Sequence, residues 1–305
     1  MSHKPSYHYR AFSLNIISDF PVTGFEPAVI TDPDVAIRAG EVPEALPQPI
    51  NRGVLYQSTG NEFLLRVDGV AAYYVRNGNE ITVQHLGNAS EGEVSAFLIG
   101  TSFGALLHQR RLLPLHASTV LYNNRCLVFA GISGSGKSTM AAALIGKGGT
   151  LVADDISVFS FTGNNPAVCP AFPYIKIWED SLVHLGLSAK GLLQVRGELK
   201  KYYLPVSRFS GTVTAIDHIF VLGSHNKPQT EIKPLQGVNK FRALKKHTYL
   251  FRGIPKTGQE QNHFLLANQL ARKVPMTMIT RPNGDFNTDN LVKCISDFLS
   301  NRSNG

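Results

Sequence analysis

The first third of the chain alternates apolar and polar residues over short runs, the period that β-strands with one buried face produce. We expect strands at residues 7–17, 53–56, 63–67, 71–75 and 81–85. Asn77-Gly78 separates the last two runs and is typical of a tight hairpin turn. Residues 41–49 contain three prolines and should form a loop. These patterns predict a small β-rich unit over residues 1–94.

The spacing then changes to that of helices alternating with apolar strands, beginning with a helix predicted over residues 95–107. The expected strands are 125–130, 150–154, 156–161, 217–222 and 276–280, and the expected helices are 138–145, 262–273 and 288–300, the last capped by Thr288. Strands followed by helices indicate an α/β layer architecture. We therefore predict a mixed α/β protein, α+β overall, with a larger α/β domain over residues 95–305.

Composition excludes several classes of protein. With 43% hydrophobic and 17% charged residues, the chain can bury a core and is not disordered as a whole. It contains no run of the roughly 20 apolar residues that a membrane-spanning helix needs. Residues 1–30 lack the pattern of a secretory signal, and Cys126, Cys169 and Cys294 are too dispersed for a disulfide framework or a zinc cluster. These features are typical of a protein of the reducing cytoplasm.

The segment Gly131-Ile-Ser-Gly-Ser-Gly-Lys-Ser138 matches the phosphate-binding loop pattern G-x-x-x-x-G-K-[ST]. An apolar strand is predicted before it and a helix after it, as that loop requires. Glycines let backbone N–H groups turn toward an anion, and the helix N-terminus and Lys137 add positive charge. The Ser138 hydroxyl is suited to Mg²⁺. The sequence predicts a site for ATP and Mg²⁺, rather than an ordinary Gly/Ser-rich turn, formed by Gly131, Ser133, Gly134, Ser135, Gly136, Lys137, Ser138 and Thr139.

Phosphoryl transfer also needs a second metal ligand and a group that accepts the proton of the acceptor hydroxyl. Asp154 and Asp155 follow a predicted strand, and neighbouring residues on a strand point to opposite faces, so only one should face the γ-phosphate. A solvated turn is the alternative for this pair. His116 would be carried back toward the loop by a hairpin of residues 119–122 and 125–130, although an isolated histidine is more often a core or surface residue. Ser118 and Thr119 receive no role from the sequence.

The string Leu-His116-Ala-Ser, followed by the phosphate loop and then Leu-Val-Ala-Asp154-Asp155, resembles HPr kinase/phosphorylase. The resemblance implies a core akin to that of phosphoenolpyruvate carboxykinase and a kinase that phosphorylates a serine of a protein. It implies that His116 lies beside the phosphates and that Asp154 or Asp155 is the base. The second metal ligand that transfer requires is expected to be Asp154, together with Ser138. HPr kinases form hexamers, so the resemblance also allows a homo-oligomer.

The chain departs from that family where HPr kinases carry a Glu-x-Arg-Gly signature, because Gln194-Val-Arg196-Gly197 has glutamine instead of the glutamate ligand. Its opening Tyr-His-Tyr-Arg-Ala-Phe-Ser-Leu, the stretch from Pro170 to Trp178 and the pair Lys200-Lys201 look like the related kinases of lasso-peptide precursors. The expected acceptor is therefore a Ser or Thr hydroxyl of a peptide or small protein. Phe172, Tyr174 and Trp178 either line an acceptor groove or belong to the core; Lys200, Lys201 and Arg208 either bind an anion or are simply solvated.

Charge separates this hypothesis from its alternatives. The formal net charge is +8, and residues 190–256 hold 13 Lys and Arg against 3 Asp and Glu. Such a local excess suits ATP and an anionic peptide better than a nucleic acid duplex. A small-molecule or carboxykinase-like phosphotransferase remains an alternative, as does an HPr-type kinase/phosphorylase. A third alternative is a non-enzymatic regulator that binds nucleic acid. It ranks last because it does not explain the pair Asp154-Asp155.

Overall fold

The N-terminal part of the protein is an eight-stranded sheet. The computed structural model describes residues 6–161, 165–197, 199–250, 257–284 and 287–301. In the first sheet the strands follow the order β1-β2-β3-β8-β7-β6-β5-β4. Their bounds are β1 Tyr7–Ala11, β2 Leu14–Ser18, β3 Val35–Ala39, β4 Asn51–Arg52, β5 Tyr56–Ser58, β6 Glu62–Val67, β7 Ala71–Arg76 and β8 Glu80–His85.

Local sequence signals located part of this sheet correctly. The hairpin of β7 and β8 is confirmed, with Asn77 and Gly78 at positive φ in its turn. Residues 7–17 were wrongly expected as one strand, because Phe12 and Ser13 adopt φ of 56° and 62° and fold the segment into a hairpin. The strand expected at residues 53–56 is mostly a turn between β4 and β5, and β3 was missed.

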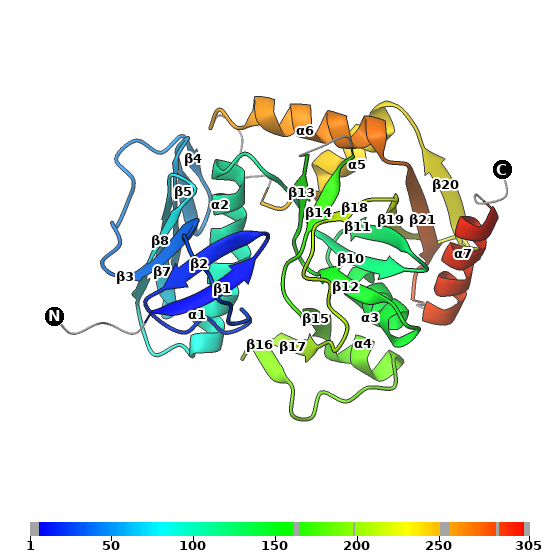
Figure 1. Ribbon diagram of the computed structural model, residues 1–305, viewed down its shortest axis with the longest axis horizontal. Coiled ribbons are helices and arrows are strands. Elements are labelled where there is room, and N and C mark those ends of the chain that lie inside the picture. The colour runs from blue at the N-terminus through cyan, green and yellow to red at the C-terminus, as the bar shows by residue number, and fades with distance from the viewer. Residues whose placement is uncertain (1–5, 162–164, 198, 251–256, 285–286, 302–305) are drawn as a thin grey trace.

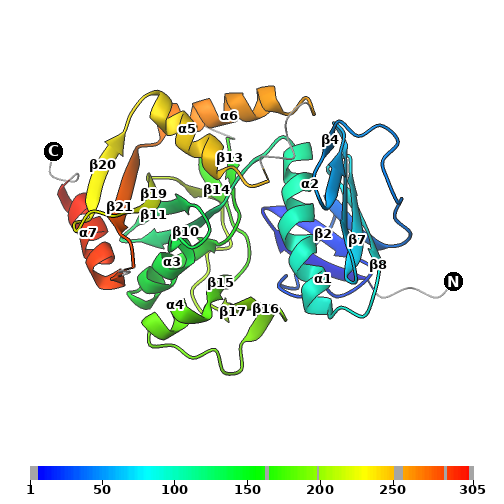
Figure 2. The ribbon, with the colours of Figure 1, turned by 180° about the vertical axis from the view of Figure 1, so that it is seen from behind.

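A helical run longer than the predicted one covers this sheet. It consists of α1 (Glu91–Phe97), the π-helical turn η1 (Leu98–Ser102) and α2 (Phe103–Gln109). Ser90 and Glu93 form a capping box that fixes its start. The run is tied to β7 because the Tyr73 hydroxyl donates to the carbonyl of Val94 at 2.8 Å. Figures 1 and 2 show it lying between the N-terminal sheet and the rest of the molecule.

A six-stranded mixed sheet forms the centre of the remaining chain, in the order β12-β10-β11-β19-β21-β20. β11, β19 and β21 are parallel, whereas β10 pairs antiparallel with both β11 and β12. The bounds are β10 Ala117–Tyr122, β11 Arg125–Gly131, β12 Thr150–Ala153, β19 His218–His225, β20 Glu231–Leu235 and β21 Met276–Pro282. This is a mixed α/β fold, and the strands expected at 125–130, 150–154, 217–222 and 276–280 are confirmed.

Helices cover both faces of the central sheet. Apolar residues of α3 (Lys137–Gly146) and α7 (Thr288–Asn301) share one buried cluster with the strands, and those of α5 (Val238–His247) and α6 (Glu260–Lys273) pack on the other side. The predictions of α3, α6 and α7 are confirmed, whereas α5 was not expected. Thr288 is not the cap of α7: the Asn287 side chain accepts a hydrogen bond from the Asn290 N–H at 3.0 Å, so Asn287 fills that role.

Two smaller sheets complete the fold. One has the order β18-β14-β13-β9 and the other β15-β17-β16, beside the short helix α4 (Glu179–His184). The bounds are β9 Leu113–Leu115, β13 Ser157–Ser160, β14 Ala167–Cys169, β15 Tyr174–Trp178, β16 Leu193–Arg196, β17 Leu199–Pro205 and β18 Thr214–Ala215. Of these, the sequence predicted only β13. None of the helices in the described residues is both long and apolar enough to cross a membrane.

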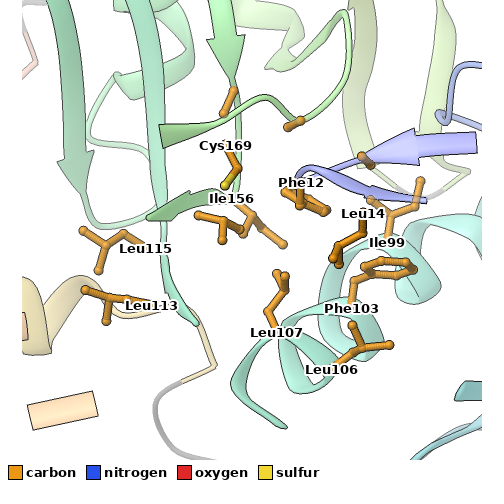
Figure 3. Close-up of a cluster of buried hydrophobic side chains, with 14 of the residues drawn as sticks. Phe12, Leu14, Ile99, Phe103, Leu106, Leu107, Leu113, Leu115, Ile156 and Cys169 are labelled. Atoms are coloured by element: carbon orange, nitrogen blue, oxygen red, sulfur yellow. The ribbon is translucent and has the colours of Figure 1, made fainter. Parts of the chain in front are cut away.

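One hydrophobic cluster joins the N-terminal sheet to the central part of the chain. Figure 3 shows Phe12, Phe103 and Leu107 facing Ile156 and Cys169 across this contact. The backbone N–H of Phe12 also donates to the carbonyl of Pro170 at 2.8 Å. Because the residues of this contact are buried in one cluster, we expect the two regions to move little relative to each other. The predicted division at residue 94, which falls within α1, stays a prediction.

Candidate active site

The predicted phosphate loop connects β11 to α3, and its backbone has the geometry that its glycines permit. Gly134 and Gly136 adopt φ of 79° and 96°, which side chains with a Cβ rarely tolerate. A Cβ on Gly131 would lie 2.9 Å from the carbonyl oxygen of Leu222 on the neighbouring strand. Gly131 is therefore required for close packing, whereas Gly134 and Gly136 are required for the direction in which the backbone turns.

Lys137 begins α3 and is almost buried, at 5% exposure. Its Nζ donates to the carbonyl of Ile132 within the loop at 3.0 Å. Burial lowers the pKa of Lys137 to about 8, although Asp154 and Asp155 act to raise it. The Ser135 hydroxyl is buried without a hydrogen-bond partner in the described residues. A desolvated cation and an unsatisfied hydroxyl in one loop fit an anionic ligand.

The β10–β11 hairpin brings His116 to the loop. Ala117 pairs with Ala130, so the preceding residue, His116, lies beside the loop end, as the sequence predicted. The Nδ1 of His116 lies 3.0 Å from the carbonyl oxygen of Asp155, which can only accept, so the proton of a neutral ring belongs on Nδ1. Burial and the charge of Lys137 lower the pKa of His116, against the opposing influence of Asp155. The ring is therefore neutral at pH 7.

Asp154 is fully buried and surrounded by donors. Its carboxylate accepts from the Ser118 hydroxyl at 2.5 Å, the Ser138 hydroxyl at 3.0 Å and the Lys176 backbone N–H at 2.8 Å. Burial, together with the charge of Asp155, raises the pKa of Asp154. Ser118 had no role in the sequence-based prediction, because the hydrogen bond that fixes this carboxylate depends on the pairing of β10 with β12.

Ser138 and Asp154 are the two residues expected at the metal, and the structure brings their oxygens together. Hydroxyl and carboxylate oxygens are hard donors of the kind that Mg²⁺ prefers. In the described residues no group of three His, Cys, Asp or Glu side chains could hold a metal ion. This small donor set fits Mg²⁺, which is usually bound through one or two protein groups together with phosphates and water.

Asp155 has a different environment from its neighbour. Its φ of 67° turns the chain after β12, and its carboxylate lies 3.0 Å from Lys176 Nζ and 3.6 Å from His116 Nδ1. Burial alone would raise the pKa of Asp155, but the charges of Lys176 and Lys201 outweigh it and hold that pKa below its ordinary value. The two adjacent carboxylates thus face different partners, with Asp154 at Ser138 and Asp155 at His116.

A cleft of about 440 Å³, open solvent included, joins these groups. The loop, His116 and Asp155 line one part of it, and residues from β15, β17 and α4 line the other. Three of the residues on this second side carry polar or aromatic groups, and the sequence analysis did not favour a site role for any of them. They are Lys176, Trp178 and Lys201. A signal for them exists in Tyr174-Ile-Lys-Ile-Trp178, where buried isoleucines alternate with cleft residues.

The other candidates around this cleft lie elsewhere. Phe172 is buried in the core at 2% exposure, and the Tyr174 hydroxyl donates to Glu26 at 2.7 Å. Arg208 donates to the carbonyl of Gly148, and the Gln194 side chain donates to that of Leu199, within its own hairpin. The basic residues of 190–256 are distributed over β16, β17, β20 and α5, which lie at different ends of the molecule (Figure 1).

Comparisons with known proteins give limited similarity. A scan against models of protein families found no match, and a search of curated proteins also found none. Among solved structures, the chain is similar to the Hpr(Ser) kinase/phosphatase from Coxiella burnetii, with 15% sequence identity and a TM-score of 0.34. That match covers 63% of this chain and 93% of the other. The function therefore has to be argued from the residues of this site.

Proposed function

We propose that the protein is an ATP- and Mg²⁺-dependent phosphotransferase that phosphorylates a Ser or Thr hydroxyl of a peptide or small protein. The observation that carries the proposal is the cleft itself. It unites a glycine-rich loop that can cradle phosphates with a histidine and an ionised carboxylate beside them. A structural turn would not need a buried lysine, a buried aspartate and an unsatisfied serine hydroxyl at one place.

The loop and its neighbours bind and orient the nucleotide. Backbone N–H groups of residues 131–136 and the Lys137 ammonium would hold the phosphates. Ser138 and Asp154 would hold Mg²⁺, which supplies neutralisation of phosphate charge when it is bound. The bonds from Ser118 and from the Lys176 backbone fix the Asp154 carboxylate in place. This arrangement supplies the positioning on which phosphoryl transfer mainly depends.

Asp155 is the better candidate for the proton acceptor because it lines the cleft, whereas Asp154 is fully enclosed. The acceptor hydroxyl oxygen forms a bond to the γ-phosphorus while the bond from that phosphorus to the β,γ-bridging oxygen breaks. Asp155 accepts the hydroxyl proton, and ADP is the leaving group. The low pKa of Asp155 keeps its carboxylate ionised, so that this carboxylate can orient the hydroxyl before transfer. Neutral His116, with Nε2 unprotonated, can accept a further hydrogen bond beside it.

The acceptor class rests on the sequence resemblance to kinases that modify lasso-peptide precursors. Candidate precursor peptides ending in serine, incubated with the protein, ATP and Mg²⁺, should gain the mass of one phosphoryl group. Asp155→Asn should lower the rate about 100-fold or more while retaining ATP binding. Lys200→Ala is the matched control, because Lys200 is exposed and its side chain forms an ion pair with Glu179. Full activity of Asp155→Asn would refute the assigned base, and absence of transfer to any hydroxyl would refute the function.

A further inference from the structure

The hairpin of β15 and β17 presents one of its faces to the cleft. Trp178 pairs with Lys201 and Lys176 pairs with Tyr203, and residues directly opposite each other in an antiparallel pair share a face. The other face carries Ile175 and Ile177, which are buried in the cluster beneath α3. The packing of these isoleucines therefore fixes which way Trp178 and Lys201 point.

The three lysines of the cleft differ in their partners. Lys176 forms an ion pair with Asp155, and Lys137 donates to a loop carbonyl. Within the part of the chain that the structure describes, Lys201 has neither an ion pair nor a side-chain hydrogen bond; its Nζ lies over the indole of Trp178, 5.8 Å from the ring centroid. A cation held by an aromatic face keeps its N–H donors available to a ligand.

The position of Lys201 relates it to the reacting groups. It lines the same cleft as His116, Lys137 and Asp155. Its charge contributes to the lowered pKa values of Lys137, His116 and Asp155 and opposes the rise in the pKa of Asp154, so its ammonium lies close enough to influence all four. Since Lys176 is neutralised by Asp155, Lys201 supplies positive charge that the protein does not compensate. An anion is the occupant that this excess charge favours.

We propose that Lys201 donates to the transferring γ-phosphoryl group of ATP, and that Trp178 positions its ammonium; this inference rests on the proposed function. Phosphoryl transfer spreads negative charge over the equatorial oxygens, and a preorganised ammonium stabilises that charge. Trp178 is 39% exposed although it is large and apolar, which its place at the cleft explains. Lys201 is then a catalytic residue and Trp178 a positioning residue.

Calorimetric titration with MgATP and MgADP tests the contact without an acceptor peptide. For Lys201→Ala, the Kd of MgATP should rise about tenfold or more, whereas that of MgADP should change less than about twofold. Lys200→Ala, one residue away on the opposite face, should leave both constants unchanged. Equal losses for the two nucleotides, or none, would overturn the role of Lys201. If the unmodified protein binds neither nucleotide, the proposed function fails as well, and this outcome is distinct from the first.

The positioning role of Trp178 is tested by the ratio of the Kd of MgADP to the Kd of MgATP. Trp178→Phe keeps an aromatic face and should preserve the preference for MgATP within about threefold, whereas Trp178→Leu should reduce it as Lys201→Ala does. A loss of stability alone would not change this ratio, so a merely structural role is excluded by the same data. Trp178 is the only tryptophan of the chain, and its emission should change when MgATP binds. An equal ratio for both variants would overturn the role of Trp178.

Discussion

The buried ion pair of Lys176 and Asp155 should be the strongest single electrostatic contribution of this site to stability. The two side chains are only 5% and 13% exposed, and the atoms lie 3.0 Å apart. At an effective dielectric constant of about 20, two charges at that distance interact by about 5 kcal/mol. Lys176→Met removes one partner and leaves Asp155 buried without it, so we expect a loss of about 3–5 kcal/mol in the free energy of unfolding.

Urea denaturation at pH 7 measures this loss, with Lys200→Met as the exposed control that should change little. The double variant Lys176→Met/Asp155→Asn removes both charges and should recover more than half of the lost stability, because no unpaired charge remains. A single variant as stable as the unmodified protein would refute the reasoning. So would a double variant that is no more stable than the single one.

The pH dependence of the same variant supplies a second check. The folded pKa of Asp155 lies below its unfolded value, so the pair stabilises the protein fully above the ordinary aspartate pKa of about 4 and loses this contribution as the pH falls through the folded pKa. Without Lys176, burial dominates and the folded pKa rises. Asp155 then takes up a proton more readily in the folded variant. The stability difference between the two proteins should therefore shrink as the pH falls from 7 toward about 5.

Three further predictions concern the loop, Asp154 and helix α2. Because burial lowers the pKa of Lys137 to about 8 and bound phosphate should raise it, nucleotide affinity measured by calorimetry should fall as the pH rises from about 7 to 10; Lys137→Arg should flatten this dependence. Ser118→Ala removes a donor from buried Asp154 and should lower unfolding stability in urea by about 1.5–3 kcal/mol; no loss would contradict the 2.5 Å bond. Gly104→Ala would place a Cβ 2.8 Å from the ring of Tyr249 and should cost about 1–3 kcal/mol by thermal denaturation, with an unchanged melting temperature as the contrary result.

Some parts of the fold were predictable because their signals are local. The hairpin at Asn77-Gly78 needs φ values that these two residues adopt readily, and the same holds for the loop at Gly134 and Gly136. Helices α3 and α6 were found from apolar spacing within a single segment. By contrast, β3 and the strands of the two smaller sheets other than β13 were missed, and most of these strands pair with a segment that is distant in the chain. The sequence of a short apolar strand does not indicate which other strand it pairs with.

The candidate site shows the same division. The loop and the pair Asp154-Asp155 could be located from the sequence, and the expectation that the two carboxylates face different ways agrees with their contacts. Which carboxylate faces Ser138 depended on the turn at Asp155 and on the Lys176 backbone, which donates to Asp154. The basic excess of residues 190–256 suggested a single region suited to ATP and an anionic peptide, but the fold separates those charges and leaves Lys201 at the cleft.

The sequence by itself therefore determined the groups that can bind phosphate, because the residues of a phosphate loop act through their own backbone and are contiguous in the chain. Only the tertiary structure decided which distant side chains meet them. Lys176, Trp178 and Lys201 reach the cleft through the register of β15 against β17, and Ser118 reaches Asp154 through the register of β10 against β12. The register of β15 against β17 is set by the burial of Ile175 and Ile177, which alternate with the cleft residues along β15. A shift of one residue would turn every cleft side chain of this hairpin away from the cleft.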